Sequence, residues 1–484
     1  MTTASPSAPR PGADDPFSDS VDALDAAHRL AREFVAGLAT RPVGHRPGPD
    51  EMRAALDAPL PEDGCDPAAA IEEWLRRAEP GIVASPGPRF FGFVNGGSTP
   101  AALAGDWLAS AIDQNAGMWL SSPAAAQTEL TVLRWLKELF GLPGAWVGSL
   151  TTGATMANLV GLAAARQWAG ERLGFDPAID GLGGNPPIPV VSSTEIHASA
   201  VKALGTLGLG RASVRKLAAP GGALDIAELR AALSAIDGPV IVIANAGEVN
   251  TGAFDDLAAV ADVCDAHPGG VWLHVDGAFG LFASISPRYA HLNAGIERAD
   301  SVGADGHKWL NVPYDCGFAF VRDADALRAA FNATGAYIAP TPDLGWDPLA
   351  HSPEMSRRFR GLAAWSALRA YGRHGYREMV ERCVDNAASF AAWIDGAEGL
   401  ELMAPAPLNI VCFRYTPDGL DDAATDEFNR AAIAAIQRDG RAFVTGTVWN
   451  GRAAIRAAFD NWATTQRDVD ILQDAVRDQR PWRS

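Results

Sequence analysis

The chain has 484 residues, and its 48% hydrophobic and 20% charged side chains are typical of a folded globular protein. A formal charge of −18 at pH 7 argues against binding to nucleic acid or to an anionic membrane surface. The sequence has no run of about 18 apolar residues, no signal-peptide pattern at its start and no cysteine spacing typical of a metal site. We therefore expect a cytoplasmic protein with reduced thiols, no bound metal and no membrane span.

The first part of the chain alternates between helical and irregular segments. Residues 1 to about 18 are rich in Pro, Ser, Ala and Asp, a composition that predicts disorder. From Val21 to Leu38, apolar residues recur at three- and four-residue steps, which predicts an amphipathic helix. The proline-rich segment from Arg41 to Pro61 is expected to be irregular, and Pro67 to Arg77 is expected to be helical.

Short apolar runs alternate with helical stretches, such as Asp225–Ala235 and Asp255–His267, through the middle of the chain. This alternation indicates an α/β domain with a largely parallel sheet. In such sheets the chemistry collects at the carboxyl ends of the strands. The expected strands are Pro189–Ser192, Val214–Leu217, Pro239–Ala244, Val271–Val275, Asp300–Gly303 and Phe318–Val321.

The pattern changes after about Tyr371, where a smaller α+β domain is expected. Its predicted elements are a long helix over Tyr376–Ile394, short strands near Asn409–Arg414 and Ala453–Phe459, and a final helix from about Thr465 to Asp478.

Lysine is scarce, and this restricts one kind of chemistry. Only Lys137, Lys202, Lys216 and Lys308 are present, because the other 36 basic residues are arginines. Arginine keeps its proton and cannot act as an amine nucleophile, so a Schiff base has only these four side chains and the N-terminus as candidates. Lys308 follows a predicted strand in the segment Asp305–Trp309, whereas the other three lysines have the pattern of surface charges.

Asp276 ends the predicted strand Val271–Val275 and is followed by the small residues Gly277 and Ala278. A carboxylate at the end of a buried strand needs a partner, which can be a helix N-terminus, a cation or a protonated ring nitrogen. Asp276 precedes Lys308 by 32 residues, roughly one strand–connection–strand unit. An acidic partner for a pyridinium and a Schiff-base lysine are the two groups that pyridoxal 5′-phosphate requires of its protein.

Two further segments complete this pattern. Residues 150–158 are small and hydroxyl-rich and lead into a helix predicted over Leu159–Trp168, so their N–H groups can bind a phosphate or form an ordinary capping loop. His197 follows the strand that ends at Ser192. A histidine there can be structural, or it can stack on a planar cofactor.

In this order along the chain, the elements resemble the group II pyridoxal-phosphate decarboxylases, which include aromatic-L-amino-acid, tyrosine, glutamate and cysteine-sulfinate decarboxylases. The resemblance runs from about Pro86 to Tyr371. Its most specific parts are His307–Trp309 with Asp315-Cys316, and His274–Ala278. Supporting matches are Arg89–Phe93, Ser121–Pro123, Ala246–Asp255 and Ser356–Arg360.

The resemblance implies fold type I and a homodimer with active sites between the subunits. The chain would then divide into a disordered tail with an N-terminal helical segment (1–98), a large domain that binds pyridoxal 5′-phosphate (99–371) and a small C-terminal α+β domain (372–484). By position, the resemblance implies the following cofactor contacts: Lys308 as the internal aldimine, Asp276 at the pyridinium nitrogen, Ala278 under the ring, His197 stacked above it, Ala154 and Thr155 at the phosphate, and His307 and Asp305 nearby.

The reaction implied is decarboxylation of an L-amino acid to an amine and CO2 through an external aldimine and a quinonoid, with Lys308, His197 and Asp276 as catalytic residues. Arg358 matches a family arginine near the active site. Aromatic residues in or near the segment that lines the family's substrate pocket favour an aromatic substrate over an acidic one: Phe91, Phe93, Trp107 and Trp119.

One departure from the family concerns its mobile loop, which carries a tyrosine thought to donate a proton. The corresponding stretch, Tyr337 to Ser356, is shorter and has no tyrosine after Tyr337. Its large residues are Trp346, His351 and Met355. In relatives, changing the tyrosine diverts the chemistry towards an aldehyde, so an oxygen-consuming aldehyde synthase is an alternative.

Other departures leave further alternatives. Met156 stands where many relatives have glutamate, and Glu248 stands where many have threonine. We expect Glu248 to pair with a nearby arginine. An aminotransferase or carbon–carbon lyase of the same fold would use Arg456 to bind a carboxylate, and a scaffold without cofactor would not need the intact pair of Lys308 and Asp276.

Overall fold

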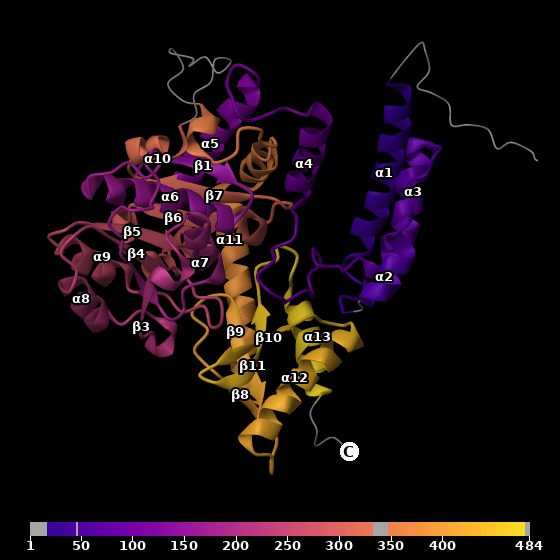
Figure 1. The fold of residues 1–484 in the computed structure, drawn as a ribbon. Helices are drawn as coiled ribbons and strands as arrows, with labels where there is room; N and C mark the ends of the chain where they lie inside the picture. The colour runs from indigo at the N-terminus through magenta and orange to yellow at the C-terminus, as the bar shows by residue number, and fades with distance from the viewer. Residues whose placement is uncertain (1–16, 45–46, 333–346, 480–484) are drawn as a thin grey trace, which may run out of the picture.

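The computed structural model describes residues 17–44, 47–332 and 347–479. Within these residues, a seven-stranded sheet has the order β1-β7-β6-β5-β4-β2-β3 (Figure 1). Strand β7 runs antiparallel to both of its neighbours, and the pairs from β6 to β3 are parallel. The strands are β1 (Val147–Thr151), β2 (Val190–Ser193), β3 (Val214–Leu217), β4 (Val240–Asn245), β5 (Val271–Asp276), β6 (Ser301–Asp305) and β7 (Gly317–Val321).

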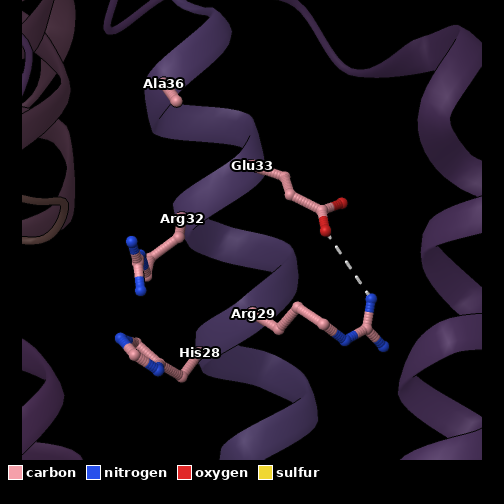
Figure 2. A pocket seen from close by; sticks show the side chains of 5 residues that line it. All are labelled: His28, Arg29, Arg32, Glu33 and Ala36. Carbon is pink, nitrogen blue, oxygen red and sulfur yellow. Dashed lines mark ion pairs between the residues drawn. The ribbon is translucent and has the colours of Figure 1, made fainter.

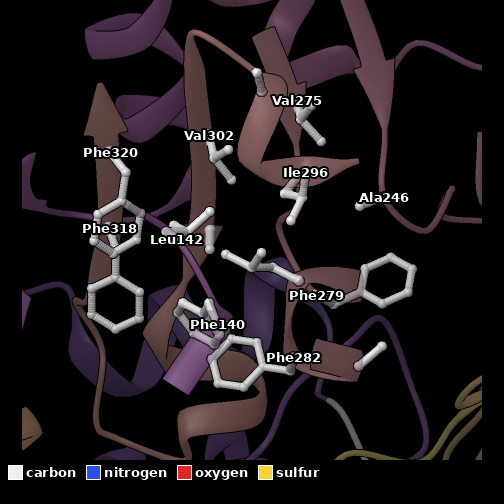
Figure 3. Packing of buried hydrophobic residues seen from close by; sticks show 14 of the residues in the cluster. Phe140, Leu142, Ala246, Val275, Phe279, Phe282, Ile296, Val302, Phe318 and Phe320 are labelled. Atoms are coloured by element: carbon white, nitrogen blue, oxygen red, sulfur yellow. The ribbon is translucent and has the colours of Figure 1, made fainter. Parts of the chain in front are cut away.

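Both faces of this sheet are covered by helices, as the side chains of β4 show. Val240 and Val242 pack in one hydrophobic cluster, and Ile241 and Ile243 pack in another on the opposite face. Because side chains alternate along a strand, a fully apolar strand must bury both faces, as expected in an α/β domain. Figure 3 shows the first cluster, in which Phe140 stacks edge-on against Phe282. The helices of this part are α4 (Pro100–Ile112), α5 (Pro123–Phe140), α6 (Ala154–Arg172), α7 (Ala198–Thr206), α8 (Ile226–Ser234), α9 (Leu257–Asp265) and α10 (Ala324–Phe331).

The C-terminal part forms a second, antiparallel sheet of order β10-β11-β9-β8. Helix α11 (Gly361–Asp395) leads into it and is interrupted at Gly372, whose φ of 59° is a left-handed conformation that favours glycine. The boundary at residue 372 coincides with this break, and the division into domains stays a prediction. The other elements are β8 (Leu400–Leu402), β9 (Ile410–Tyr415), α12 (Asp422–Asp439), β10 (Thr445–Trp449), β11 (Arg452–Ala458) and α13 (Gln466–Arg477).

Three helices at the N-terminal side lie beside the rest of the chain (Figure 1): α1 (Ser18–Gly37), α2 (Pro49–Leu56) and α3 (Pro67–Ala78). Helices α1 and α3 confirm the predicted helices. A shallow pocket on α1 is lined by His28, Arg29, Arg32, Glu33 and Ala36 (Figure 2). None of the helices in the described part of the chain has the length and hydrophobicity that crossing a bilayer requires.

Three sequence-based expectations differ from the structure. The proline-rich segment before Pro61 contains α2, because Pro49 occupies the first helical turn, where its fixed φ and missing N–H cost nothing. Strand β1 was not predicted, and it pairs only with β7 at the edge of the sheet. Helix α6 begins at Ala154 rather than Leu159, so the hydroxyl-rich segment is partly the first turn of the helix. The predicted disorder of residues 1 to about 18 falls almost wholly outside the described residues.

In the interior beside β1, an ion pair joins Arg357, in the segment before α11, to Glu129 of α5. The two side chains are 2.8 Å apart and almost inaccessible to solvent. Arg357 also donates to the carbonyl oxygens of Ala116 and Leu150, and the Leu150 N–H donates to Glu129. Each buried charge therefore has its counter-charge and several hydrogen-bond partners.

We expect Arg357→Met to lower the free energy of unfolding by about 3–5 kcal/mol, because the Glu129 carboxylate is left buried without its cation. Arg357→Met combined with Glu129→Leu removes both charges and is expected to recover much of the loss. Arg134→Met is a control, since its pair with Glu138 is exposed and contributes at most about 1 kcal/mol. Urea denaturation followed by circular dichroism measures all three variants. A double variant no more stable than Arg357→Met would contradict this account.

Candidate active site

The carboxyl ends of β5 and β6 bring the predicted site residues together. These strands are parallel neighbours, with Asp276 opposite Gly303 in the register. Strand β5 ends at Asp276 and β6 ends at Asp305, three residues before Lys308. The N-terminus of α6 lies at the same edge, because the Ala154 N–H donates to the Asp305 carboxylate. Sheet topology thus gathers segments that are more than 100 residues apart in the sequence.

Lys308 lies in a single helical turn after β6, formed by Gly306–Leu310. Its Nζ atom is 3.0 Å from Asp305 Oδ2 and lies over the ring of Phe279. The side chain is 17% exposed, which leaves its amine within reach of a small molecule. Lys308 is therefore the amine that the described geometry offers for carbonyl chemistry at this edge.

The other three lysines lie in different environments. Lys137 Nζ donates to the carbonyl oxygens of Gly144 and Trp146, which closes the end of α5. Lys202 and Lys216 are exposed, on α7 and β3. Lys202 and Lys216 are therefore surface charges, as predicted from the sequence, whereas Lys137 is half-buried.

Asp276 is 4% exposed, and both of its carboxylate oxygens accept hydrogen bonds. Asn158 Nδ2 donates to Oδ2 over 2.8 Å, and the Ala278 N–H donates to Oδ1 over 3.1 Å. The Ala278 carbonyl in turn accepts from the Asp305 N–H, which links the ends of β5 and β6. Both donors are neutral, so no cation in the described residues compensates the charge of the buried carboxylate. Such a carboxylate can bind a cationic ring nitrogen.

His197 forms the N-cap of α7 and is exposed on the open side of the site. Its Nδ1 atom accepts from the Ser199 N–H and lies 2.6 Å from Ser199 Oγ, so the neutral ring carries its proton on Nε2. The protein around the ring disfavours its charged form and lowers the pKa of His197, which the Asp276 carboxylate opposes. His197 is thus a neutral ring at neutral pH, with its Nε2–H available.

The start of α6 fits a phosphate group. Gly153 has φ of 149°, and a Cβ atom there would lie 3.1 Å from His307 Cε1 and 3.2 Å from an Asp305 oxygen. The N-cap residue, Gly153, has no side chain to cap the helix, and the buried His307 Nδ1 has no hydrogen-bond partner among the described residues. An open helix N-terminus with a nearby unpaired ring nitrogen is a suitable environment for an anion. Thr155 is exposed in this first turn, whereas the Ala154 N–H is already bonded to Asp305.

Two residues near Lys308 were not identified from the sequence. Tyr314 stacks on His307 with 4.2 Å between ring centroids, and its hydroxyl donates to Asn95. Asp460 follows β11 and is buried, and this burial raises the pKa of its carboxyl group to about 7 against the opposing effects of Lys308 and Arg456. The run of apolar residues before Asp460 reads only as the end of a strand, so no sequence signal marked it.

The expected substrate residues lie in different places. Phe91 is 1% exposed and packs against Phe459 in the core of the small sheet, and its contact with the substrate stays a prediction. Phe93 is exposed, and its carbonyl accepts from Arg456 Nη2. Arg358 donates to Asp106 and Ser110 on α4 rather than to the residues around Lys308.

Glu248 does not form the expected pair with an arginine. Its carboxylate accepts hydrogen bonds from the Asn250 N–H and from the N–H and hydroxyl of Thr251, so it closes its own turn. His351 is buried beside the Asp347 carbonyl. Tyr337 and Trp346 lie outside the described residues. In the described ranges, no group of three or more His, Cys, Asp or Glu side chains is arranged to hold a metal ion.

Comparison with known proteins identifies the family. A family model described as the pyridoxal-dependent decarboxylase conserved domain matches residues 49–416. An aromatic-L-amino-acid decarboxylase of Bacillus atrophaeus is 31% identical over 455 residues, 91% of each protein. A phenylacetaldehyde synthase of Arabidopsis thaliana is 28% identical over 442 residues, 87% of this chain and 88% of that protein.

The fold agrees with these relationships. A crystal structure of Oryza sativa TDC with PLP and tryptamine superposes with a TM-score of 0.89 at 28% identity, over 97% of this chain and 98% of that one. The α/β fold with its mostly parallel sheet and a separate small antiparallel sheet is therefore the fold of this family. The chain belongs to the pyridoxal-dependent decarboxylase family and is an amino-acid decarboxylase that uses pyridoxal 5′-phosphate.

Proposed function

We propose that the protein decarboxylates an aromatic L-amino acid to the corresponding amine and CO2. The observation that carries the proposal is the placement of Lys308 and Asp276 at the ends of neighbouring strands, beside the open N-terminus of α6. The similarity to an aromatic-L-amino-acid decarboxylase supports the aromatic substrate. We expect Phe93 and Arg358 to contribute to the substrate pocket. Arg358 contacts α4 of its own subunit, so it would contribute to the pocket of the other subunit, where α4 would border that pocket.

Pyridoxal 5′-phosphate, when bound, supplies an electron sink for the pair released as the bond from Cα to the carboxylate breaks. Lys308 Nζ is the amine that would hold the cofactor covalently and would be released when the substrate amine takes its place. Asp305, 3.0 Å from Nζ, is the neighbouring acceptor for a proton that Lys308 must lose before it can act as a nucleophile. Thr155, Ala154 and His307 would hold the phosphate, with Asp305 orienting Ala154.

Asp276 holds a proton on the pyridine nitrogen, because its buried carboxylate stabilises a cation more strongly than water would. Ala278 would leave space for the flat ring, and His197 would stack on it. A neutral His197 can donate its Nε2–H to the carboxylate of the substrate without a competing charge.

We expect Lys308→Ala to abolish decarboxylation and the absorbance band near the edge of the visible range, because the covalent link to the cofactor is lost. Lys202→Ala is the control, since that lysine is exposed on α7. Absorbance spectra before and after borohydride reduction measure the link. A band of normal intensity in Lys308→Ala would show that another amine binds the cofactor.

A second candidate function is oxidative decarboxylation with deamination, which consumes oxygen and gives an aldehyde, CO2, ammonia and hydrogen peroxide. One observation favours it: the stretch from Tyr337 to Ser356 has no tyrosine after its first residue. The similarity to a phenylacetaldehyde synthase is in line with this candidate. Without a phenol from this loop, protonation at Cα would be slower, and reaction with oxygen could then compete with it.

Product analysis separates the candidates. The purified holoenzyme is incubated with a panel of aromatic and acidic L-amino acids while CO2, amine, aldehyde and oxygen are measured together. We expect amine and CO2 in equal amounts, no oxygen uptake and faster turnover of aromatic substrates. Aldehyde with peroxide would replace the proposal by the oxidative reaction, and a keto acid without CO2 would indicate an aminotransferase.

We further propose a homodimer with active sites between the subunits. Helices α1 and α3 carry large apolar side chains that are exposed in the single chain, including Val21, Leu24 and Trp74. Exposed apolar residues on neighbouring helices are typical of a surface covered by another subunit. Sedimentation velocity at micromolar concentration is expected to give twice the mass of one chain, and Leu24→Glu with Trp74→Glu is expected to shift it towards the monomer. A wild-type monomer would contradict the assembly.

A further inference from the structure

A chain of hydrogen bonds leads from Asp276 into the interior of the large sheet. Asn158 of α6 donates to Asp276 over 2.8 Å, and Asn158 Oδ1 is 3.1 Å from His274 Nε2. His274 Nδ1 is 2.8 Å from Ser301 Oγ on β6, which accepts from the Trp272 indole N–H over 2.8 Å. All five side chains are buried. Such a chain lies behind the expected cofactor contact and touches no substrate.

The two ends fix the direction of every hydrogen bond in the chain. Asp276 can only accept, so Asn158 turns its Nδ2 towards it and its Oδ1 towards His274. His274 must then carry its proton on Nε2, and its Nδ1 accepts from the Ser301 hydroxyl. Trp272 can only donate, and the remaining lone pair of Ser301 Oγ accepts its N–H.

Burial keeps His274 neutral, which this arrangement requires. Full burial lowers the pKa of His274 to about 4, although the nearby Asp276 carboxylate opposes the shift. A doubly protonated ring would present a second N–H to Ser301, whose hydroxyl hydrogen would then have no acceptor. The neutral Nε2–H form is therefore the one that satisfies every group.

Two glycines make room for these hydrogen-bonded side chains. A Cβ atom on Gly161 of α6 would lie 2.8 Å from two atoms of the His274 ring, and one on Gly303 of β6 would lie 2.6 Å from Asn158 Oδ1. Both distances are too short for real contacts between these atoms. The close approach of α6 to β5 and β6 therefore depends on glycine at the positions that face the polar side chains.

We infer that His274 is a positioning residue, which fixes the Asn158 amide so that its Nδ2 faces Asp276 and holds this carboxylate ready for the cofactor nitrogen. A reversed amide would place Asn158 Oδ1 against the Asp276 carboxylate and Nδ2 against the His274 N–H, two repulsive contacts. Without the His274 donor, only the repulsion between Asn158 Oδ1 and the Asp276 carboxylate opposes the reversal. This inference rests on the proposed role of Asp276.

Cofactor affinity tests the inference without any substrate. Apoprotein is titrated with pyridoxal 5′-phosphate while tryptophan fluorescence is recorded, for His274→Leu and for His274→Gln, whose amide nitrogen can replace Nε2 as a donor. We expect the dissociation constant to rise about tenfold in His274→Leu and about threefold or less in His274→Gln. His267→Leu is the matched control. His267 is also buried, and it is hydrogen-bonded to Gly238, but it takes no part in the series of hydrogen bonds that ends at Asp276.

Two further variants, Ser301→Ala and Asp276→Asn, separate a positioning role of His274 from loss of folding and from a wrong assignment of Asp276. Ser301→Ala changes little volume and removes one donor, so a smaller loss of affinity is expected even if His274→Leu does not fold. Affinity of His274→Leu within twofold of the wild type, or an equal loss in His274→Gln and His274→Leu, would overturn the positioning role. Asp276→Asn is measured alongside: normal affinity in that variant would show that the assignment of Asp276 has failed, whatever the behaviour of His274.

Discussion

The burial of one carboxylate at the end of β5 constrains much of the large domain. Asp276 loses most of its hydration, and the structure replaces it with two neutral donors, Asn158 and the N–H of Ala278. One donor comes from α6 and the other from the turn after the strand. The helix must therefore lie in one register against the sheet, because a shift by one residue would turn Asn158 away and leave the carboxylate with the Ala278 N–H as its remaining donor.

This register also explains how the remaining groups meet. Along β5, Trp272, His274 and Asp276 point to the same face, since side chains alternate along a strand. Helix α6 runs along that face: Asn158 meets Asp276, Gly161 lies against the His274 ring, and Trp168 contacts Trp272 edge-on, 5.9 Å between centroids. With α6 held there, its N-terminus comes to lie next to Asp305 and His307. One helix thus supplies both the partner of the carboxylate and the open end suited to a phosphate.

The sequence allows the strands and the reactive pair to be predicted, because each depends on a local pattern. Buried strands are apolar runs bounded by Gly, Pro or Asp, and Lys308 and Asp276 follow such runs directly. Strand β1 was missed because Gly148 and Ser149 interrupt its apolar residues and a hydroxyl-rich turn follows it. Asp460 and Tyr314 could not be found, since their proximity to Lys308 depends on how the small sheet and a later loop pack. The packing of Phe91 in the small sheet could not be predicted, because an aromatic side chain gives no sign of which sheet it packs against.

Asn158 shows that a motif of adjacent residues contains only part of the site. The segment His274–Asp276 reads as one local signature, yet these two side chains are joined only through an amide from α6, 116 to 118 residues earlier. The same Nδ2 lies 3.2 Å from Ser199 Oγ, which is 2.6 Å from His197 Nδ1. Asp276, expected at the ring nitrogen of the cofactor, and His197, expected to stack on the ring, are therefore both linked to one amide, His197 through Ser199. A rotation of this amide would disturb both at once, so the buried His274 that prevents it controls more of the site than its distance from the substrate suggests.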